Sequence, residues 1–153
     1  MATIKAIRLT LFLSAVFFTL NAYSQQPVKW SYSSKKISDK VYEVQMTAQI
    51  DQPWHIYSQS TPEGGPLPTK ISFNQNPMLE IDGEAKENGN LVQKHEEVFG
   101  VDVKYYAGQV TFVQTVAIKK KAKTNITGKI EYMACTDERC LPPATVSLSV
   151  PIK

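Results

Sequence analysis

The stretch that decides the fold is VYEVQMTAQI, residues 41–50. Its even-numbered positions, from Tyr42 to Ile50, are apolar, and Glu43, Gln45, Thr47 and Gln49 alternate with them. A hydrophobic period of two residues is typical of a β-strand that buries one face. We therefore predict a half-buried strand over residues 41–50.

Further strand-like stretches follow along the chain. Shorter ones lie at residues 55–57, 69–73 and 79–81, and longer ones at residues 110–118, 126–134 and 145–152. Turn-rich segments such as TPEGGP, residues 61–66, separate them, and Pro151 favours an edge strand or a strand end. No segment has a sustained helical stripe. The pattern predicts a single all-β domain, an immunoglobulin-like antiparallel β-sandwich.

The amino terminus has the pattern of an export signal. Lys5 and Arg8 precede an apolar run over residues 9–20, and small residues follow up to Ser24. The run has only twelve residues, too few to cross a bilayer comfortably. We predict that residues 1–24 are a cleaved signal peptide and that residues 25–153 form the mature domain. We expect this domain to be soluble and periplasmic or otherwise exported, in a compartment where disulfides persist.

The charge balance gives no case for nucleic-acid binding. Two basic residues lie in the predicted signal peptide, so the mature domain has 15 basic and 14 acidic residues, a net charge of +1. A basic cluster, residues 119–123, falls between two predicted strands, where a solvated turn is expected.

The only two cysteines, Cys135 and Cys140, lie five positions apart in YMACTDERCLPP, residues 132–143. A disulfide that closes so short a loop contributes about 2 kcal/mol to stability. A bridge across a polar turn is also accessible to another thiolate, and disulfide exchange requires that access. The spacing leaves two interpretations open: an exchangeable bridge and a stabilising hairpin disulfide. A zinc site would need both cysteines, His55 and His95 to converge, which the spacing does not favour, so we predict no metal and no cofactor.

Three stretches together resemble one family. They are WHIY (residues 54–57), HEEVFG (residues 95–100) and YMACTDERCLPP (residues 132–143). Their order and spacing, from about residue 30 to the carboxyl end, are similar to the amino-terminal periplasmic domain of the thiol:disulfide interchange protein DsbD. That domain is immunoglobulin-like and relays electrons.

The resemblance implies a role for each cysteine. In the family, the disulfide accepts electrons from a membrane-embedded partner, and the dithiol then reduces periplasmic thioredoxin-like or isomerase proteins, a chemistry associated with cytochrome c biogenesis. By resemblance, Cys140 forms the mixed disulfide with partners and Cys135 resolves it. The chain would then be a protein-disulfide reductase component.

The resemblance also implies a cap loop and an active-site lining. Phe99 matches the aromatic residue that covers the disulfide until a partner displaces it; the matching cap loop is Glu96, Glu97, Phe99 and Gly100. His55 and Tyr57 match aromatic side chains that line the active site. Arg139 is adjacent to Cys140 and would favour its thiolate, whereas Asp137 and Glu138 would oppose it.

DsbD itself continues into further domains, whereas this sequence stops at Lys153. We therefore expect a free-standing, monomeric module whose electron donor is a separate membrane protein. The alternative is a non-catalytic immunoglobulin-like binding or accessory module in which the bridge only holds a loop. Reduction potential separates the two, because structural disulfides are markedly more reducing than exchangeable ones.

Overall fold

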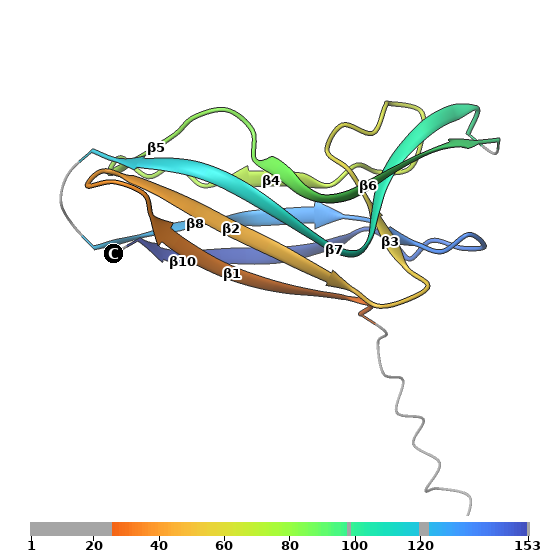
Figure 1. Ribbon diagram of the computed structural model, residues 1–153, viewed down its shortest axis with the longest axis horizontal. Coiled ribbons are helices and arrows are strands. Elements are labelled where there is room, and N and C mark those ends of the chain that lie inside the picture. Colours follow the sequence, from red (N-terminus) through yellow and green to blue (C-terminus); the bar gives the residue numbers. More distant parts are fainter. Residues whose placement is uncertain (1–25, 98, 120–122, 153) are drawn as a thin grey trace, which may run out of the picture.

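The computed structural model describes residues 26–97, 99–119 and 123–152, which form two antiparallel β-sheets (Figure 1). The strands are β1 (Val28–Lys36), β2 (Val41–Ile50), β3 (His55–Tyr57), β4 (Lys70–Phe73), β5 (Leu79–Ile81), β6 (Lys86–Glu96), β7 (Val101–Ile118), β8 (Thr124–Tyr132), β9 (Ala134–Cys135) and β10 (Ala144–Ile152). The predicted all-β, immunoglobulin-like sandwich is confirmed.

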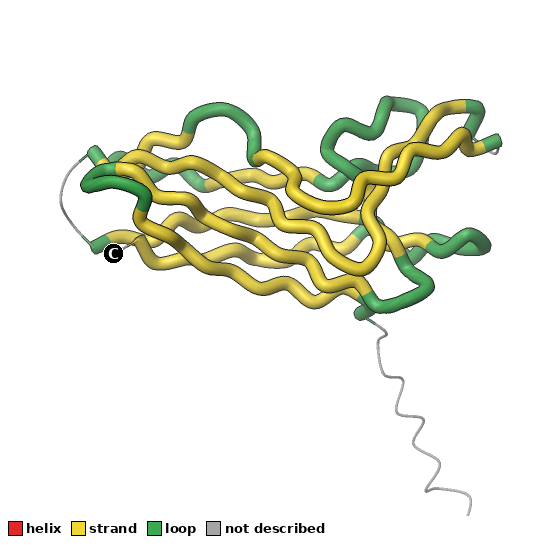
Figure 2. The backbone as a smooth tube through the Cα atoms, in the orientation of Figure 1, coloured by secondary structure: helices red, strands yellow, loops and turns green. Residues whose placement is uncertain are grey.

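Strand β7 organises the larger sheet, which has the order β1-β2-β7-β3-β9 with β5 and β6 also paired to β7. The carboxyl-terminal half of β7 pairs with β2, whereas its amino-terminal half pairs with β3, opposite residues His55 to Tyr57. The smaller sheet has the order β10-β8-β4 and packs against the larger one, so that the two sheets overlap in the view of Figure 2. One long strand therefore connects the body of the sandwich to the end that carries β3 and β9.

The main core lies between the two sheets. Val44, Met46 and Phe112 contribute to it from the larger sheet, and Ile130 and Leu148 contribute from the smaller one, all almost fully buried. In β2 the side chains predicted to face inward are buried at every even position from 42 to 50, as the period of two requires. The body of the sandwich is therefore held by apolar packing between the sheets.

Several strand boundaries differ from those predicted. Strands β2, β3 and β5 match the predicted ranges, but the predicted strand at residues 126–134 is interrupted at Met133 and continues as β9. Strands β1 and β6 and the amino-terminal half of β7 were not predicted. Most of β6 is polar and exposed, so hydrophobic periodicity gave no signal there. In β1 the apolar residues Val28, Trp30 and Tyr32 alternate with polar ones, a short period-two signal that was overlooked.

Two predictions fall on residues that the structure does not describe. The proposed signal peptide lies within residues 1–25, and residues 120–122 belong to the basic cluster. In the described part of the chain, no helix is long and apolar enough to cross a membrane.

Candidate functional site

The two cysteines close a tight hairpin tip. A disulfide joins Cys135, the last residue of β9, to Cys140, and the two residues face each other as an antiparallel pair. Thr136 fixes the turn between them. Its backbone N–H donates to the carbonyl of Arg139 (2.7 Å), and its hydroxyl accepts from the N–H groups of Glu138 (3.2 Å) and Arg139 (3.1 Å). Such side-chain to backbone hydrogen bonds stabilise turns, so a short polar sequence brings the two sulfurs together.

The two sulfurs lie in unequal surroundings. Cys135 is 1% exposed and packs with Tyr57 and Val103 in a small apolar cluster separate from the main core. Cys140 is exposed. Of the two cysteines, Cys140 is therefore the one that an approaching thiolate can reach.

Side chains alternate along β3, so one face of the strand contributes to the main core and the other face lies against the disulfide. Trp54 and Ile56 belong to the main core. His55 and Tyr57 lie on the other face, where His55 pairs in register with Cys135. The structure thus brings both sequence-predicted lining residues to the buried side of the disulfide.

The aromatic side chains around His55 form a compact group. His55 Nε2 lies 3.2 Å from the Tyr57 hydroxyl, and the His55 ring centroid lies 4.4 Å from that of Tyr105 on β7. Burial lowers the pKa of His55, while Asp137 and Glu96 act in the opposite direction. Burial, with smaller effects of Glu96 and Tyr105, raises the pKa of Tyr57 to about 12. Near neutral pH, Tyr57 is therefore a neutral phenol.

The predicted cap residues lie at the tip of the β6–β7 hairpin. Glu96 ends β6, Glu97 and Gly100 are in the turn, and Phe99 is 44% exposed, so Phe99 is not a core residue. Gly100 has a φ of 67°, which a glycine adopts without strain. The hairpin tip and the cysteine loop project from the same end of the molecule (Figure 1). The covering role of Phe99 stays a prediction.

An ion-pair network connects the hairpin to the cysteine loop. Lys94 Nζ on β6 lies 3.2 Å from Glu96 Oε1 and 3.8 Å from Asp137 Oδ1 in the turn between the cysteines. At the base of the hairpin, Glu87 accepts hydrogen bonds from the hydroxyls of Ser58 (2.6 Å) and Tyr106 (2.8 Å). Lys94, Glu87 and Tyr106 were not predicted, because the strands that carry them were not predicted.

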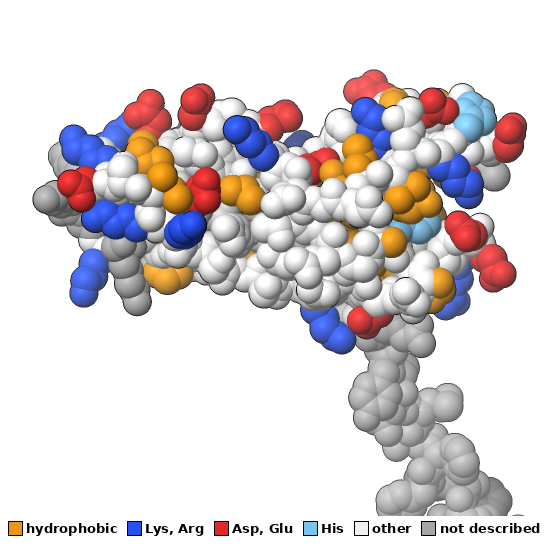
Figure 3. All heavy atoms as spheres, viewed as in Figure 1, with side chains coloured by type: hydrophobic (Ala, Val, Ile, Leu, Met, Phe, Trp, Pro, Cys, Tyr) orange, Lys and Arg blue, Asp and Glu red, His pale blue; other side chains and the backbone are white. Residues whose placement is uncertain are grey.

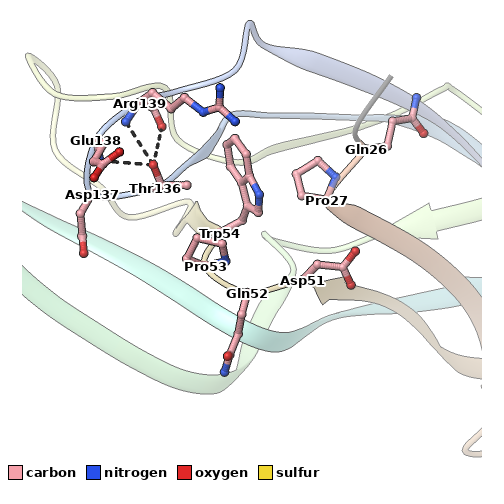
Figure 4. Close-up of a pocket in the computed structure, with 10 residues that line it drawn as sticks. All are labelled: Gln26, Pro27, Asp51, Gln52, Pro53, Trp54, Thr136, Asp137, Glu138 and Arg139. Carbon is pink, nitrogen blue, oxygen red and sulfur yellow. Dashed lines mark hydrogen bonds between the residues drawn. The ribbon is translucent and has the colours of Figure 1, made fainter. Parts of the chain in front are cut away.

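Arg139 contacts Trp54, the residue before His55. Its guanidinium carbon is 5.5 Å from the centroid of the Trp54 ring, a distance that suits a cation–π contact. Both residues line an open cleft of about 760 Å³ together with Asp51, Asp137 and Glu138 (Figure 4). Charged side chains of both signs surround the hydrophobic side chains at this end of the molecule (Figure 3). Across the described residues, no three His, Cys, Asp or Glu side chains form a group that could hold a metal ion.

Comparison with known proteins identifies the family. The profile described as "Thiol:disulfide interchange protein DsbD, N-terminal" matches residues 23–151. The chain belongs to the DsbD N-terminal domain family. The resemblance of the three sequence stretches to that family is thus confirmed, and the disulfide-forming pair in a DsbD N-terminal domain suggests thiol-disulfide exchange.

Solved structures share the fold of this DsbD N-terminal domain. The reduced DsbD N-terminal domain of Neisseria meningitidis is 14% identical, with a TM-score of 0.52 over 80% of this chain and 83% of that chain. The N-terminal periplasmic domain of ScsB from Proteus mirabilis is 17% identical, with a TM-score of 0.59 over 85% of this chain and 48% of that chain. A complex of the DsbD and PilB N-terminal domains from Neisseria meningitidis gives 15% identity and a TM-score of 0.52 over 82% of this chain and 84% of that chain. At these identities the likeness shows the fold alone. No curated protein matches the sequence.

Reduction should open the bridge without unfolding this DsbD N-terminal domain. The main core does not include the disulfide, and the six-residue loop contributes only about 2 kcal/mol. We expect circular dichroism of the reduced form to retain the β-sheet spectrum and the melting temperature to fall by several degrees. The double variant Cys135→Ser with Cys140→Ser is the matched control and should behave like the reduced protein. Loss of the folded spectrum on reduction would instead indicate a structural bridge.

Proposed function

We propose that this chain is an exported thiol-disulfide exchange domain that passes two electrons through Cys135 and Cys140. The electrons come from a membrane-embedded donor protein and go to a thioredoxin-like or isomerase acceptor. The observation that carries the proposal is the unequal exposure of the two cysteines, one 1% exposed and the other open to solvent. A stabilising bridge has no need of one accessible sulfur, whereas an exchange reaction requires it.

Cys140, the exposed residue of the pair, suits the first step of exchange. The Cys140 thiolate attacks one sulfur of the acceptor disulfide, whose other sulfur leaves as a thiolate and takes a proton from water. The Cys135 thiol then loses its proton and attacks Cys140 Sγ. The mixed disulfide breaks, and the second acceptor sulfur leaves. The acceptor has gained two electrons and two protons, and the domain has regained its disulfide.

A partner domain of thioredoxin-like type fits the family. One of the similar structures is a complex between the DsbD and PilB N-terminal domains, so a domain of this fold binds another domain there. Here the exposed Cys140 and the charged turn beside it offer the corresponding surface. Export of the domain, directed by residues 1–24, would place the bridge in a compartment that maintains disulfides.

We further propose that the β6–β7 hairpin tip restricts access to the bridge. Phe99 is an exposed aromatic residue at the tip, in the position that matches the cap residue of the family. The contact between Lys94 and Asp137 links the hairpin to the cysteine loop at 3.8 Å. Since exposed ion pairs contribute about 0 to 1 kcal/mol, a docking partner could separate the two elements readily.

Single-cysteine variants test the roles of the two thiols. Cys135→Ser should leave Cys140 able to trap a partner as a stable mixed disulfide, whereas Cys140→Ser should trap little, because Cys135 is buried. Each variant is incubated with an extract of the exported compartment, and mass spectrometry identifies the linked peptides. The double variant is the control for non-covalent association. Equal trapping by both single variants would contradict the assignment of Cys140 as the attacking thiol.

Truncation of Phe99 tests the cap. Phe99→Ala should change the free energy of unfolding by less than about 1 kcal/mol, because the side chain is already 44% exposed. If Phe99 covers the bridge, the variant should be reduced faster by dithiothreitol. Leu91→Ala is a matched control, since Leu91 lies on the same hairpin and is 45% exposed. An unchanged reduction rate in Phe99→Ala, or equal acceleration in both variants, would remove the cap role.

A further inference from the structure

We propose that His55 exchanges a proton with the Cys135 thiol: it accepts the proton when Cys135 attacks and returns it when Cys135 leaves. The proposal rests on the exchange function argued above and assigns a chemical role to a side chain that the family resemblance identified only as part of the lining. It concerns the buried thiol of the pair.

The register of the sheet places the two side chains together. His55 on β3 and Cys135 on β9 are direct antiparallel partners. Side chains of such partners project from the same face, with Cβ atoms about 4.5 to 5.5 Å apart. The next pair, Ile56 and Ala134, belongs to the main core. His55 and Cys135 therefore share the opposite face, where Tyr57 packs against Cys135.

The neighbours of His55 hold its ring in place. The ring meets Tyr57 edge-on, with centroids 5.3 Å apart, and it lies 4.4 Å from the ring of Tyr105. The contact of Nε2 with the Tyr57 hydroxyl, at 3.2 Å, leaves Nδ1 as the second site for a proton. Within the described residues, Nδ1 makes no side-chain or backbone hydrogen bond. The ring is thus oriented without having both nitrogens occupied.

Cys135 needs such a partner because of its burial. It is 1% exposed and is surrounded by the apolar parts of Tyr57, Val103 and Met133. A thiolate in those surroundings is poorly solvated, and only the thiolate is the nucleophile. Water has little access to the sulfur, so a protein group is better placed to take up its proton.

The charges around His55 suit a base that works near neutral pH. Burial lowers the pKa of the imidazole, which keeps it neutral and able to accept a proton. Asp137 on the cysteine loop and Glu96 on β6 act in the opposite direction and would stabilise the imidazolium once it forms; Lys94 on β6 opposes them. The phenol of Tyr57 on β3 is neutral near neutral pH, and the ring of Tyr105 on β7 packs against the imidazole.

His55 takes up and returns one proton in each exchange step. When a mixed disulfide sits on Cys140, the proton of the Cys135 thiol moves to the His55 imidazole, and the Cys135 thiolate attacks Cys140 Sγ. The bond from Cys140 to the partner sulfur breaks, and the partner leaves as a thiolate that takes up a proton as His55 returns its own to water. In the reverse direction, a donor thiolate attacks Cys140 Sγ, and Cys135 leaves with the proton from imidazolium.

The attack of Cys135 on Cys140 can be measured by itself when glutathione forms the mixed disulfide with Cys140. Reduced full-length mature protein is mixed with excess oxidised glutathione and quenched with acid, and intact mass spectrometry follows first the glutathione adduct and then the closed disulfide. In His55→Gln, closure should slow on the order of 100-fold near pH 7. Its rate should rise about tenfold per pH unit as the thiol alone ionises. In the wild type, the rate should rise as His55 loses its proton below pH 6.5 and then change little.

Two controls accompany this experiment: the rate at which glutathione is captured, and a variant of the second histidine, His95. Adduct formation at the exposed Cys140 should keep its wild-type rate in His55→Gln, and His95→Gln, on the exposed hairpin, should behave as wild type throughout. If His55→Gln closes its disulfide at the wild-type rate and with the wild-type pH profile, the proposal is overturned. Equal slowing of capture and closure in His55→Gln would also overturn it, because it indicates a structural defect. Failure of the wild type to form any adduct would count against the exchange function itself.

A measurement on the unaltered protein covers the case in which His55→Gln does not fold. Nuclear magnetic resonance of the His55 ring gives its titration in the disulfide and dithiol forms. The dithiol form should show a second transition that coincides with ionisation of Cys135. Identical titration curves in the two forms would overturn the proposal.

Discussion

The pairing of the three-residue strand β3 with β7 on one side and β9 on the other is the constraint on which the site depends. Because side chains alternate along β3, Trp54 and Ile56 are committed to the main core, and His55 and Tyr57 must face the disulfide. A shift of one residue in this register would exchange the two sets. Ile56 is fully buried, and its burial therefore fixes the register in which His55 pairs with Cys135.

The molecule divides into a stable body and an end suited to chemistry. The body is the sandwich whose core includes Met46, Phe112 and Ile130, none of which depends on the bridge. At the other end, a short loop, an exposed hairpin tip and surface ion pairs interact weakly. Opening a disulfide in such a place changes the local contacts while the interior retains its packing. Function and stability thus rest on different residues.

The sequence was sufficient for the fold class and for much of the site, because both depend on local patterns. Period-two alternation marked β2, and the short spacing of Cys135 and Cys140 marked the bridge. The hairpin was missed as a strand pair: β6 is mostly polar and exposed, and nothing local shows that β7 supports it. Hence Lys94 and Tyr105, whose roles come from long-range pairing, could not be predicted. The unequal burial of the two cysteines likewise comes from tertiary packing.

The central claim is that the bridge between Cys135 and Cys140 is exchangeable, and its reduction potential tests this most directly. The protein is equilibrated with glutathione or thioredoxin redox buffers, and thiol alkylation with mass spectrometry gives the reduced fraction. An exchangeable bridge should have a potential above about −300 mV, within the range of proteins that exchange electrons, and the folded protein should be reduced and reoxidised reversibly. A potential below about −300 mV, or reduction that occurs only when the domain unfolds, would contradict the claim and identify a structural disulfide.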